Sequence, residues 1–336
     1  MRAYELNGSS IDALRLVERP VPRPGPGQVL VRVRAASLNF RDLLIADGTY
    51  PRGPSPLVPA SDGAGEVVEV GPGTRQLKPN DRVMGAFFEK WIDGPFDLQT
   101  ALASARGGSI DGVLAEYCLF DEAAAVKLPD GLGFAAAATL PCAGVTAWVS
   151  VVELGRVSAG QTLLAMGTGG VSTFALQLAK HAGASVITTS SSDAKLERAR
   201  ALGADHGINY RDTPDWAAAA RALTGGRGVD HLVEVGGAGT LEQSLQALRP
   251  GGHLALVGQL SGAMAPRDRA IDDPRGARVD SVFVGSARQL ADLAAFVGRT
   301  RLEPVIDRVF GFDEVVPAYR HLERGAHFGK VVIAVG

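Results

Sequence analysis

A glycine-rich turn between a buried strand and a helix is the feature that most constrains how this chain folds. Residues 162–166 (TLLAM) have the apolar pattern of a buried strand, and residues 172–182 (STFALQLAKHA) have the spacing of an amphipathic helix. The turn is made of Gly167, Thr168, Gly169, Gly170, Val171 and Ser172. Such a turn in this context is typical of a dinucleotide site, because glycine lets backbone N–H groups approach a pyrophosphate at a helix N-terminus. The alternative is a glycine turn that only joins a strand to a helix.

Strands and helices alternate beyond this turn. Strand-like runs occupy residues 185–189, 229–235 and 253–257, and helical runs occupy residues 193–202 and 241–248. Such alternation indicates βαβ units and a parallel sheet with helices on both faces. The sequence therefore predicts an α/β fold with a doubly wound sheet.

The first part of the chain has a different pattern. Short runs at residues 28–35, 65–70, 81–84 and 114–119 indicate strands separated by turns. The tail, residues 290–336, adds no further βαβ unit, so we expect it to pack on this first domain. The expected division is a β-rich domain of residues 1–124 and 287–336 and a cofactor domain of residues 125–286.

The residues after the second strand of the cofactor domain favour NADPH over NADH. NAD sites generally carry Asp or Glu about 20 residues beyond the glycines, where it accepts from the ribose 2′-hydroxyl. Residues 188–192 are Thr and Ser only, and Asp193 follows as a helix-start residue. The hydroxyls of Ser190 and Ser191 and the ammonium of Lys195 suit a 2′-phosphate instead. The alternative for Lys195 is a solvated surface position.

Composition excludes several other classes of protein. The chain of 336 residues has 34 Lys and Arg against 36 Asp and Glu, so it lacks the basic surplus of a nucleic-acid-binding protein. Its two cysteines are too few for a disulfide framework. No apolar run is long enough for a signal peptide or a membrane helix. We therefore expect a soluble, cytoplasmic protein with no membrane or nucleic-acid partner.

The order of these features resembles the medium-chain dehydrogenase/reductase superfamily. A β-rich amino-terminal domain, the GTGGVS turn and a short tail ending in GKVVI carry the resemblance over essentially the whole chain. The resemblance implies a GroES-like catalytic domain and a Rossmann cofactor domain. Within the superfamily the chain is similar to the zinc-free branch of quinone oxidoreductases and enoyl reductases.

The zinc-ligand positions of the superfamily are altered in this sequence. Zinc alcohol dehydrogenases place ligands in a C-H-x-D segment, in a G-H-E-x-x-G segment and at a later Cys. The matching positions here are Asn39, Ser61 and Cys142, and residues 86–115 lack the four cysteines of a structural zinc lobe. A catalytic zinc needs three protein ligands plus an open position, so we expect no zinc at either place. Cys142 is expected to be a small buried apolar residue, or else to line a substrate pocket.

The catalytic candidates come from the same segments. Asn39 is a neutral amide that can donate to a developing oxyanion, and Asp42 can orient Asn39 or a water molecule. Tyr50 matches a pocket tyrosine of quinone oxidoreductases, and its phenol can donate a hydrogen bond or a proton. The alternatives are that Asn39 and Asp42 cap a helix and that Tyr50 only packs over its loop.

Further cofactor contacts are implied by the resemblance and by the strand ends, where open α/β sheets bind ligands. They are Thr146, Tyr210, Gly236, Gly258, Gly285 and Lys330. The alternatives are that each strand-end glycine is a turn and that Thr146 bonds back within its own helix.

Three functions remain open from the sequence. The first is an NADPH-dependent, metal-independent reductase of quinones or α,β-unsaturated carbonyls. The second is an alcohol or aldehyde dehydrogenase that works without zinc through Tyr50. The third is a protein that binds NADPH without turnover. The aromatic residues of segment 87–112 roof a substrate pocket or cover a core edge, and the edge strand at residues 279–285 predicts a homodimer.

Overall fold

The chain forms two compact units. The computed structural model describes residues 1–50, 52–258, 273 and 275–336. The first unit joins Met1–Val145 to Val284–Gly336, and the second unit is Thr146–Phe283. The expected division lay at residues 124/125 and 286/287. The first boundary between the units lies later in the sequence than expected. The reason is that β7 (Ala125–Lys127) pairs with β5 (Arg82–Gly85) in the sheet of the first unit.

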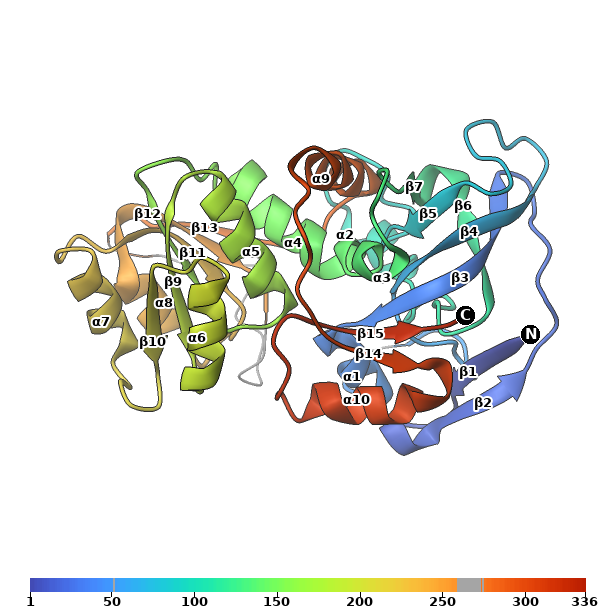
Figure 1. Ribbon diagram of the computed structural model, residues 1–336, viewed down its shortest axis with the longest axis horizontal. Helices are drawn as coiled ribbons and strands as arrows, with labels where there is room; N and C mark the ends of the chain where they lie inside the picture. Colours follow the sequence, from blue (N-terminus) through green and yellow to red (C-terminus); the bar gives the residue numbers. More distant parts are fainter. Residues whose placement is uncertain (51, 259–272, 274) are drawn as a thin grey trace. The chain divides into compact units, whose positions relative to one another are not determined.

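The first unit is built on a seven-stranded sheet. Its strands run in the order β14-β15-β3-β4-β5-β7, and β6 pairs with β3 (Figure 1). The remaining bounds are β3 Gln28–Leu38, β4 Asp62–Val70, β6 Tyr117–Asp121, β14 Ile306–Gly311 and β15 Lys330–Ala334. The antiparallel pairing of β15 with β3 places the last strand of the chain in this sheet.

Short elements surround this sheet. A separate hairpin is formed by β1 (Arg2–Leu6) and β2 (Leu14–Glu18). The helices of the first unit are α1 Phe40–Ala46, α2 Leu98–Ala103, α3 Phe134–Ala137, a π-helical turn Leu140–Gly144, α9 Ala287–Thr300 and α10 Val315–Glu323. Helix α10 buries its apolar face, including Tyr319, in the same core as β3 and α1. The core thereby fixes the end of β3, where α1 begins.

The aromatic residues of segment 87–112 form a small core of their own. Phe87 and Phe88 are buried with Ala101 and Ala105, and Trp91 and Phe96 pack against them. The ring centroids of Trp91 and Phe96 are 4.9 Å apart. The carbonyl of Trp91 also accepts the first backbone N–H of α9, at 3.0 Å. These contacts favour the core-edge alternative for this segment.

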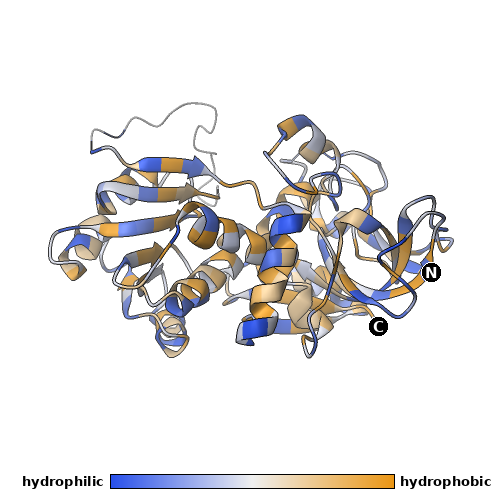
Figure 2. Cartoon of the chain, turned by 90° about the horizontal axis from the view of Figure 1, so that it is seen from above, coloured by the Kyte–Doolittle hydropathy of each residue, from blue (hydrophilic) through white to orange (hydrophobic). Residues whose placement is uncertain are grey.

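The second unit is a parallel six-stranded sheet in the order β10-β9-β8-β11-β12-β13. The strands are β8 Thr162–Ala165, β9 Ser185–Ser190, β10 His206–Asn209, β11 Val229–Glu234, β12 Leu248–Leu256 and β13 Arg278–Ser281. The helices that pack on it are α5 Gly170–His181, α6 Asp193–Ala201, α7 Trp216–Leu223 and α8 Leu241–Ala247. Figure 2 shows hydrophobic and hydrophilic residues together on the helices, as expected for helices that cover a sheet with one face.

These two units confirm the α/β class, with a β-rich GroES-like part and a Rossmann-like part. Strand β10 and helix α7 were not expected from the sequence. β10 is only four residues long and contains Gly207, so its sequence shows no alternation of apolar and polar residues. The strand expected near residues 280–285 is shorter and earlier in the structure, at β13.

Candidate functional site

The glycine turn of the second unit has the geometry of a phosphate-binding loop. Gly167 has φ of 74°, which L side chains rarely adopt, and a Cβ on Gly169 would meet no atom within 4 Å. Ser172 donates its hydroxyl to the carbonyl of Met166 at 2.5 Å, which ties α5 to the end of β8. Because the turn is open at Gly169, backbone N–H groups at the start of α5 are placed to hold a pyrophosphate.

The residues expected at the 2′-position of the adenosine ribose lie in β9, in α6 and just after β10. Ser190 ends β9, and its carbonyl accepts the backbone N–H of Tyr210 at 3.0 Å. Lys195 stands half-buried in the first turn of α6. The carboxylate of Asp193 accepts from the side chain of Asn209 at 3.0 Å. The structure thus brings Ser190 and Tyr210 together at the ends of neighbouring parallel strands, with Lys195 in the helix that follows β9.

Glu234 is a residue that sequence reasoning missed. Its fully buried carboxylate accepts from the backbone N–H groups of Gly236 at 2.6 Å and Gly237 at 3.0 Å, and from the hydroxyl of Thr240 at 2.8 Å. Its carbonyl also accepts the N–H of Gly258 at 3.1 Å. One residue therefore holds both strand-end segments that contain the predicted cofactor contacts Gly236 and Gly258. The only sequence signal was an acidic residue inside the apolar run LVEV.

Close packing explains the two strand-end glycines. A Cβ on Gly236 would lie 2.2 Å from the Thr240 hydroxyl, and a Cβ on Gly258 would lie 2.0 Å from the carbonyl oxygen of Val235. Gly285 is buried immediately before Ser286, the N-cap of α9. These contacts favour the alternative that Gly236 and Gly258 are turn residues, at which close packing requires glycine.

Thr146 is the first residue of the second unit. It is buried, and its carbonyl accepts the hydroxyl of Ser150 at 2.7 Å. The hydrogen bond that Thr146 makes within its own helix therefore uses its backbone carbonyl and not its side-chain hydroxyl.

A buried polar chain crosses the first unit. Lys330, the first residue of β15, donates through Nζ to the carbonyl of Leu38 at 2.6 Å and to Asn39 Oδ1 at 2.5 Å. Asn39 Nδ2 donates to Ser61 Oγ at 3.3 Å, and Ser61 Oγ donates to Asp62 Oδ1 at 2.6 Å. The pairing of β3 with β4 and β15 brings these residues together from three separate parts of the sequence.

The chain continues to the third zinc-ligand position. Asp62 Oδ2 accepts the backbone N–H of Cys142 at 3.0 Å. Burial raises the pKa of the Asp62 carboxyl, and the ammonium of Lys330 opposes that shift. Burial also raises the pKa of the Cys142 thiol well above its usual range. Cys142 packs against the aromatic core of segment 87–112, as expected for a small apolar residue.

This set of side chains does not fit a catalytic zinc. Zinc sites use thiolate, imidazole and carboxylate ligands, whereas Asn39 and Ser61 are neutral and Lys330 carries a positive charge within the set. Among the residues that the structure describes, no group of three or more His, Cys, Asp and Glu side chains is arranged to hold a metal ion.

Asp42 and Tyr50 lie at opposite ends of α1. Asp42 is buried, and its Oδ2 accepts the backbone N–H of Asn39 at 2.7 Å, which caps the helix. Burial raises the pKa of Asp42 to about 6. Tyr50 follows the helix, with its backbone N–H on the carbonyl of Leu44 at 2.9 Å, and its half-buried ring packs against the core. The structure thus brings Asp42 to Asn39, while Tyr50 lies beyond the carboxyl end of the same helix.

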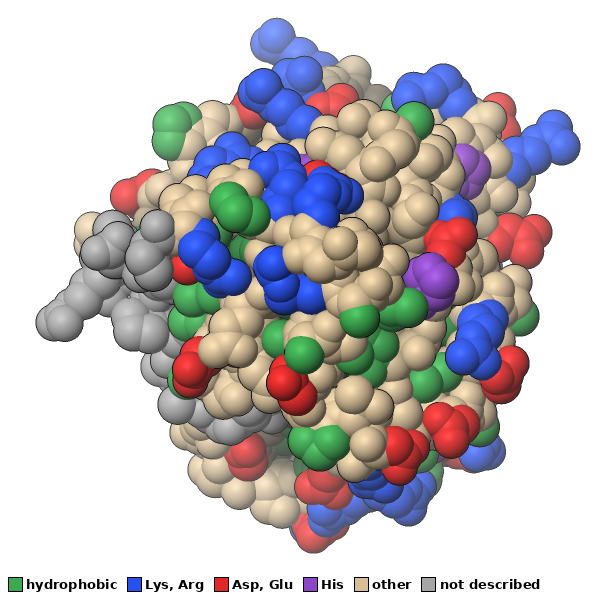
Figure 3. Space-filling model, turned by 90° about the vertical axis from the view of Figure 1, so that its left-hand side faces the viewer, with side chains coloured by type: hydrophobic (Ala, Val, Ile, Leu, Met, Phe, Trp, Pro, Cys, Tyr) green, Lys and Arg blue, Asp and Glu red, His purple; other side chains and the backbone are tan. Residues whose placement is uncertain are grey.

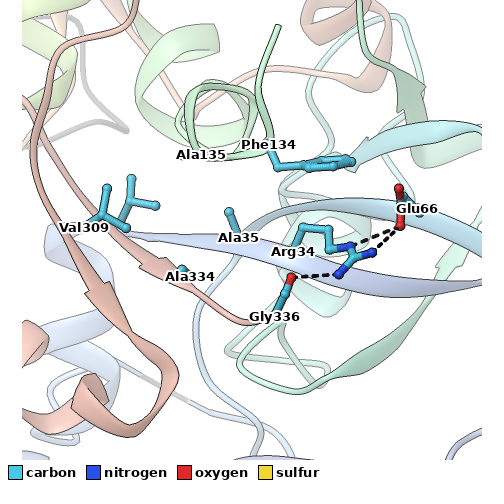
Figure 4. Close-up of a pocket in the computed structure, with 9 residues that line it drawn as sticks. Arg34, Ala35, Glu66, Phe134, Ala135, Val309, Ala334 and Gly336 are labelled. Atoms are coloured by element: carbon cyan, nitrogen blue, oxygen red, sulfur yellow. Dashed lines mark hydrogen bonds and ion pairs between the residues drawn. The ribbon is translucent and has the colours of Figure 1, made fainter.

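A surface pocket of the first unit is distinct from this polar chain. It measures about 310 Å³ and is lined by Phe134, Val309 and the end of β15, with Arg34 at its rim. Figure 4 shows the Arg34 guanidinium bonded to Glu66 and to the carbonyl of Gly336. Because Arg34 is already paired and no predicted catalytic residue lines the pocket, it is not the candidate site.

The surface gives no sign of an extended basic groove on the face seen in Figure 3. Basic side chains there are interrupted by acidic and apolar ones. In the part of the chain that the structure covers, no helix is long and apolar enough to cross a membrane.

The fold and the turn are those of a two-domain protein with a Rossmann-like dinucleotide-binding unit. The model of the alcohol dehydrogenase GroES-like domain matches residues 25–130, and the model of the zinc-binding dehydrogenase domain matches residues 170–298. A zinc-type alcohol dehydrogenase-like protein of Schizosaccharomyces pombe is 43% identical over 97% of this chain and 96% of its own length. The 2-methylene-furan-3-one reductase of Solanum lycopersicum is 35% identical over 96% of this chain and 76% of its own length.

Solved structures agree with these relatives. A putative alcohol dehydrogenase of Sinorhizobium meliloti superposes with a TM-score of 0.90 at 43% identity, covering 99% of this chain and 98% of that one. A quinone oxidoreductase of Pseudomonas syringae gives 0.84 at 25% identity, covering 99% of each chain. A mycobacterial protein in complex with NADPH gives 0.82 at 28% identity, covering 100% of each. The chain belongs to the medium-chain dehydrogenase/reductase superfamily and is an NAD(P)-dependent oxidoreductase.

Proposed function

We propose that this protein is an NADPH-dependent, metal-independent reductase of quinones or α,β-unsaturated carbonyl compounds. The observation that carries the proposal is the buried Lys330–Asn39–Ser61 chain, in which Asn39 and Ser61 stand at two of the three positions that match zinc ligands in the zinc enzymes. A fixed amide donor suits acceptors that delocalise negative charge, since these need less electrophilic help than a simple carbonyl. The similarity to an enone reductase and to a quinone oxidoreductase supports the same substrate class.

The second unit supplies the cofactor site in this proposal. The turn from Gly167 to Val171 would hold the pyrophosphate with the backbone N–H groups that follow Gly167, whose own N–H donates to Thr189. Ser190, Ser191 and Lys195 would bind the 2′-phosphate, with Tyr210 beside them. Thr146 and Gly285 are the remaining proposed contacts.

The first unit supplies the polar groups of the reaction. NADPH, when bound, is the hydride donor. Negative charge then develops on the acceptor's carbonyl oxygen, and the Asn39 Nδ2–H group would stabilise it by donating a hydrogen bond. Asp42 would keep Asn39 in place through the helix cap, and Tyr50 is the proposed proton donor. The substrate would be a small hydrophobic quinone or enone.

Assembly through the edge of the parallel sheet is part of the proposal. Strand β13 lies at one edge of that sheet and leaves one row of backbone groups unpaired within the described sheet. A second copy that pairs along residues 279–285 would form a homodimer. Sedimentation as a monomer at micromolar concentration would contradict this assembly.

The decisive experiment is NADPH consumption by the purified protein with a chelator present. An ortho-quinone, an enone and a simple aldehyde are the three acceptors, and NADH replaces NADPH in a parallel series. We expect turnover with the quinone or the enone, little with the aldehyde, and a preference for NADPH. Turnover with the aldehyde alone, or activity that the chelator abolishes, would refute the proposal. Tight NADPH binding without turnover of any acceptor would favour a binding protein.

A further inference from the structure

The buried ammonium of Lys330 determines which way the Asn39 amide points. Lys330 Nζ lies 2.5 Å from Asn39 Oδ1 and has the carbonyl of Leu38 as its second partner. An amide has one acceptor end and one donor end, and an ammonium group only donates. With Oδ1 held by the ammonium, Nδ2 must face away from Lys330. The opposite orientation would set an NH₂ group against an NH₃⁺ group.

The rest of the polar chain agrees with this direction. The Ser61 hydroxyl donates to Asp62 Oδ1, so its oxygen is left to accept from Asn39 Nδ2. The other oxygen of Asp62 accepts the backbone N–H of Cys142. Each bond from Lys330 to Asp62 therefore runs the same way, from the positive end of the chain to the negative end.

Burial makes this arrangement rigid and electrically strong. The exposed fractions are 3% for Lys330, 8% for Asn39 and 0% for both Ser61 and Asp62. Hydrogen bonds to charged groups are stronger than neutral ones, and chains of bonds polarise one another where water is excluded. An ammonium that donates to the amide oxygen withdraws electron density from Nδ2. The Nδ2–H group then becomes a better donor.

We propose that Lys330 is the positioning residue for the oxyanion donor of this enzyme. Its ammonium would hold the Asn39 amide with Nδ2 turned away, so that one Nδ2–H donates to Ser61 and the second is strengthened toward the carbonyl oxygen of a quinone or enone. This inference rests on the proposed function, because it takes Asn39 as the donor. It gives Lys330 a role in the acceptor half of the reaction, in place of the cofactor contact that the family resemblance implies.

The test compares two substitutions of the lysine. Lys330→Met removes the ammonium at similar length, and Lys330→Arg keeps a positive charge and N–H donors. We expect Lys330→Met to lower kcat about tenfold with quinone or enone, by weakening one transition-state donor. The Kd of NADPH should stay within about twofold, as for a residue that does not touch the cofactor. Lys330→Arg should recover a large part of kcat. An unchanged kcat with a raised Kd of NADPH would assign Lys330 to the cofactor and overturn the proposal.

A double-variant cycle tests whether Lys330 acts through Asn39. In an Asn39→Ala background the amide is gone, so Lys330→Met should cause no further loss of kcat. Losses that multiply would mean that the two side chains act independently, which would also overturn the proposal.

A charge-neutral double substitution is the control for effects on folding. Lys330→Met leaves Asp62 buried without its counter-charge, which destabilises the protein by itself. The variant Lys330→Met/Asp62→Asn removes both charges, and we expect a higher Tm than for Lys330→Met with the same tenfold loss of kcat. Wild-type kcat in this variant would refute the positioning role.

Failure of the proposed function is recognised separately. If the wild-type protein reduces no quinone or enone, the proposed function fails, while the Lys330–Asn39 relationship is still tested by thermal unfolding of Lys330→Met, Asn39→Ala and their combination. Non-additive Tm shifts are the expected result, and additive shifts would contradict the orientation of the amide by the lysine.

Discussion

The backbone N–H of Gly167 donates to the side-chain hydroxyl of Thr189, 3.1 Å away. This bond links the first glycine of the phosphate turn to β9, whose last residue, Ser190, begins the proposed 2′-phosphate site. The two parts of the cofactor site are therefore fixed to each other by a side chain. Gly167, whose φ is 74°, has no side chain, so the link is made by the side chain of Thr189.

Thr189→Val should weaken cofactor binding without changing side-chain volume. The substitution leaves the N–H of Gly167 unpaired, and a lost hydrogen bond of this kind costs about 1 kcal/mol, or roughly fivefold in Kd. Fluorescence titration with NADPH measures the change. Thr188→Val is the matched control, because the buried Thr188 hydroxyl has no hydrogen-bond partner in the described part of the chain. Equal effects of both variants would contradict the role given to Thr189.

Lys195→Ala should separate the two nicotinamide cofactors. The ammonium is proposed to bind the 2′-phosphate, which NADH lacks, and charge-assisted bonds contribute about 1.5–3 kcal/mol. We expect the Kd of NADPH to rise roughly 10- to 100-fold and the Kd of NADH to change less than about twofold. Lys180→Ala serves as the control, because its ammonium pairs with Asp205 elsewhere on the same unit. An unchanged Kd of NADPH would remove Lys195 from the site.

Glu234→Ala should disorder the strand-end segment that contains Gly236, whereas the backbone bond from Gly258 to the carbonyl of residue 234 is kept. Four donors lose their acceptor, namely the N–H groups of Gly236 and Gly237 and the hydroxyls of Thr240 and Ser244. Leaving buried donors unpaired costs about 3 kcal/mol or more in unfolding free energy, which lowers Tm by about 4 °C in a protein of this size.

Glu234→Gln is the informative companion to this variant. It keeps one oxygen for the backbone N–H groups of Gly236 and Gly237 and offers an NH₂ group to the Ser244 hydroxyl. We expect a much smaller fall in Tm, measured by calorimetry. If the Gln and Ala variants are equally unstable, the negative charge and not the hydrogen-bond geometry holds the segment.

Local patterns predicted the second unit well because its features are local. The glycine turn, the helix after it and strands β8 and β9 depend on residues that are near neighbours in the sequence. The absence of a carboxylate after β9 is also readable without a structure. By contrast, Glu234 looks like an ordinary strand-end acid until its four donors are placed around it.

Local sequence patterns do not predict the polar chain of the first unit. Lys330 and Asn39 are 291 positions apart, and only the pairing of β15 with β3 brings them into contact. The resemblance to zinc enzymes marked Asn39, Ser61 and Cys142 as altered positions, but it did not indicate that a lysine joins them. Likewise, helix-capping rules predicted the bond of Asp42 to Asn39, whereas its burial and raised pKa depend on the packing of α10.

Asp42→Asn should change the pH dependence of stability in a defined direction. The pKa of Asp42 is raised by burial from 3.8 to about 6, so the folded protein favours the protonated carboxyl. Its contribution is fully present below pH 3.8 and is lost as the pH rises through about 6. At pH 7 the ionised carboxylate therefore destabilises the folded protein by about 3 kcal/mol, at 1.36 kcal/mol per pKa unit. The amide that Asp42→Asn introduces is uncharged and can still accept the backbone N–H of Asn39.

The measurement is the difference in unfolding free energy between Asp42→Asn and wild type from pH 4 to pH 7. His231 and His253, whose pKa values burial lowers to about 4, titrate over the same range, and taking the difference cancels their contribution. We expect the variant to gain stability relative to wild type by about 1.4 kcal/mol for each pH unit between 4 and 6, and then to level off. A difference that is flat across this range would mean that Asp42 titrates near 3.8 in the folded protein as well.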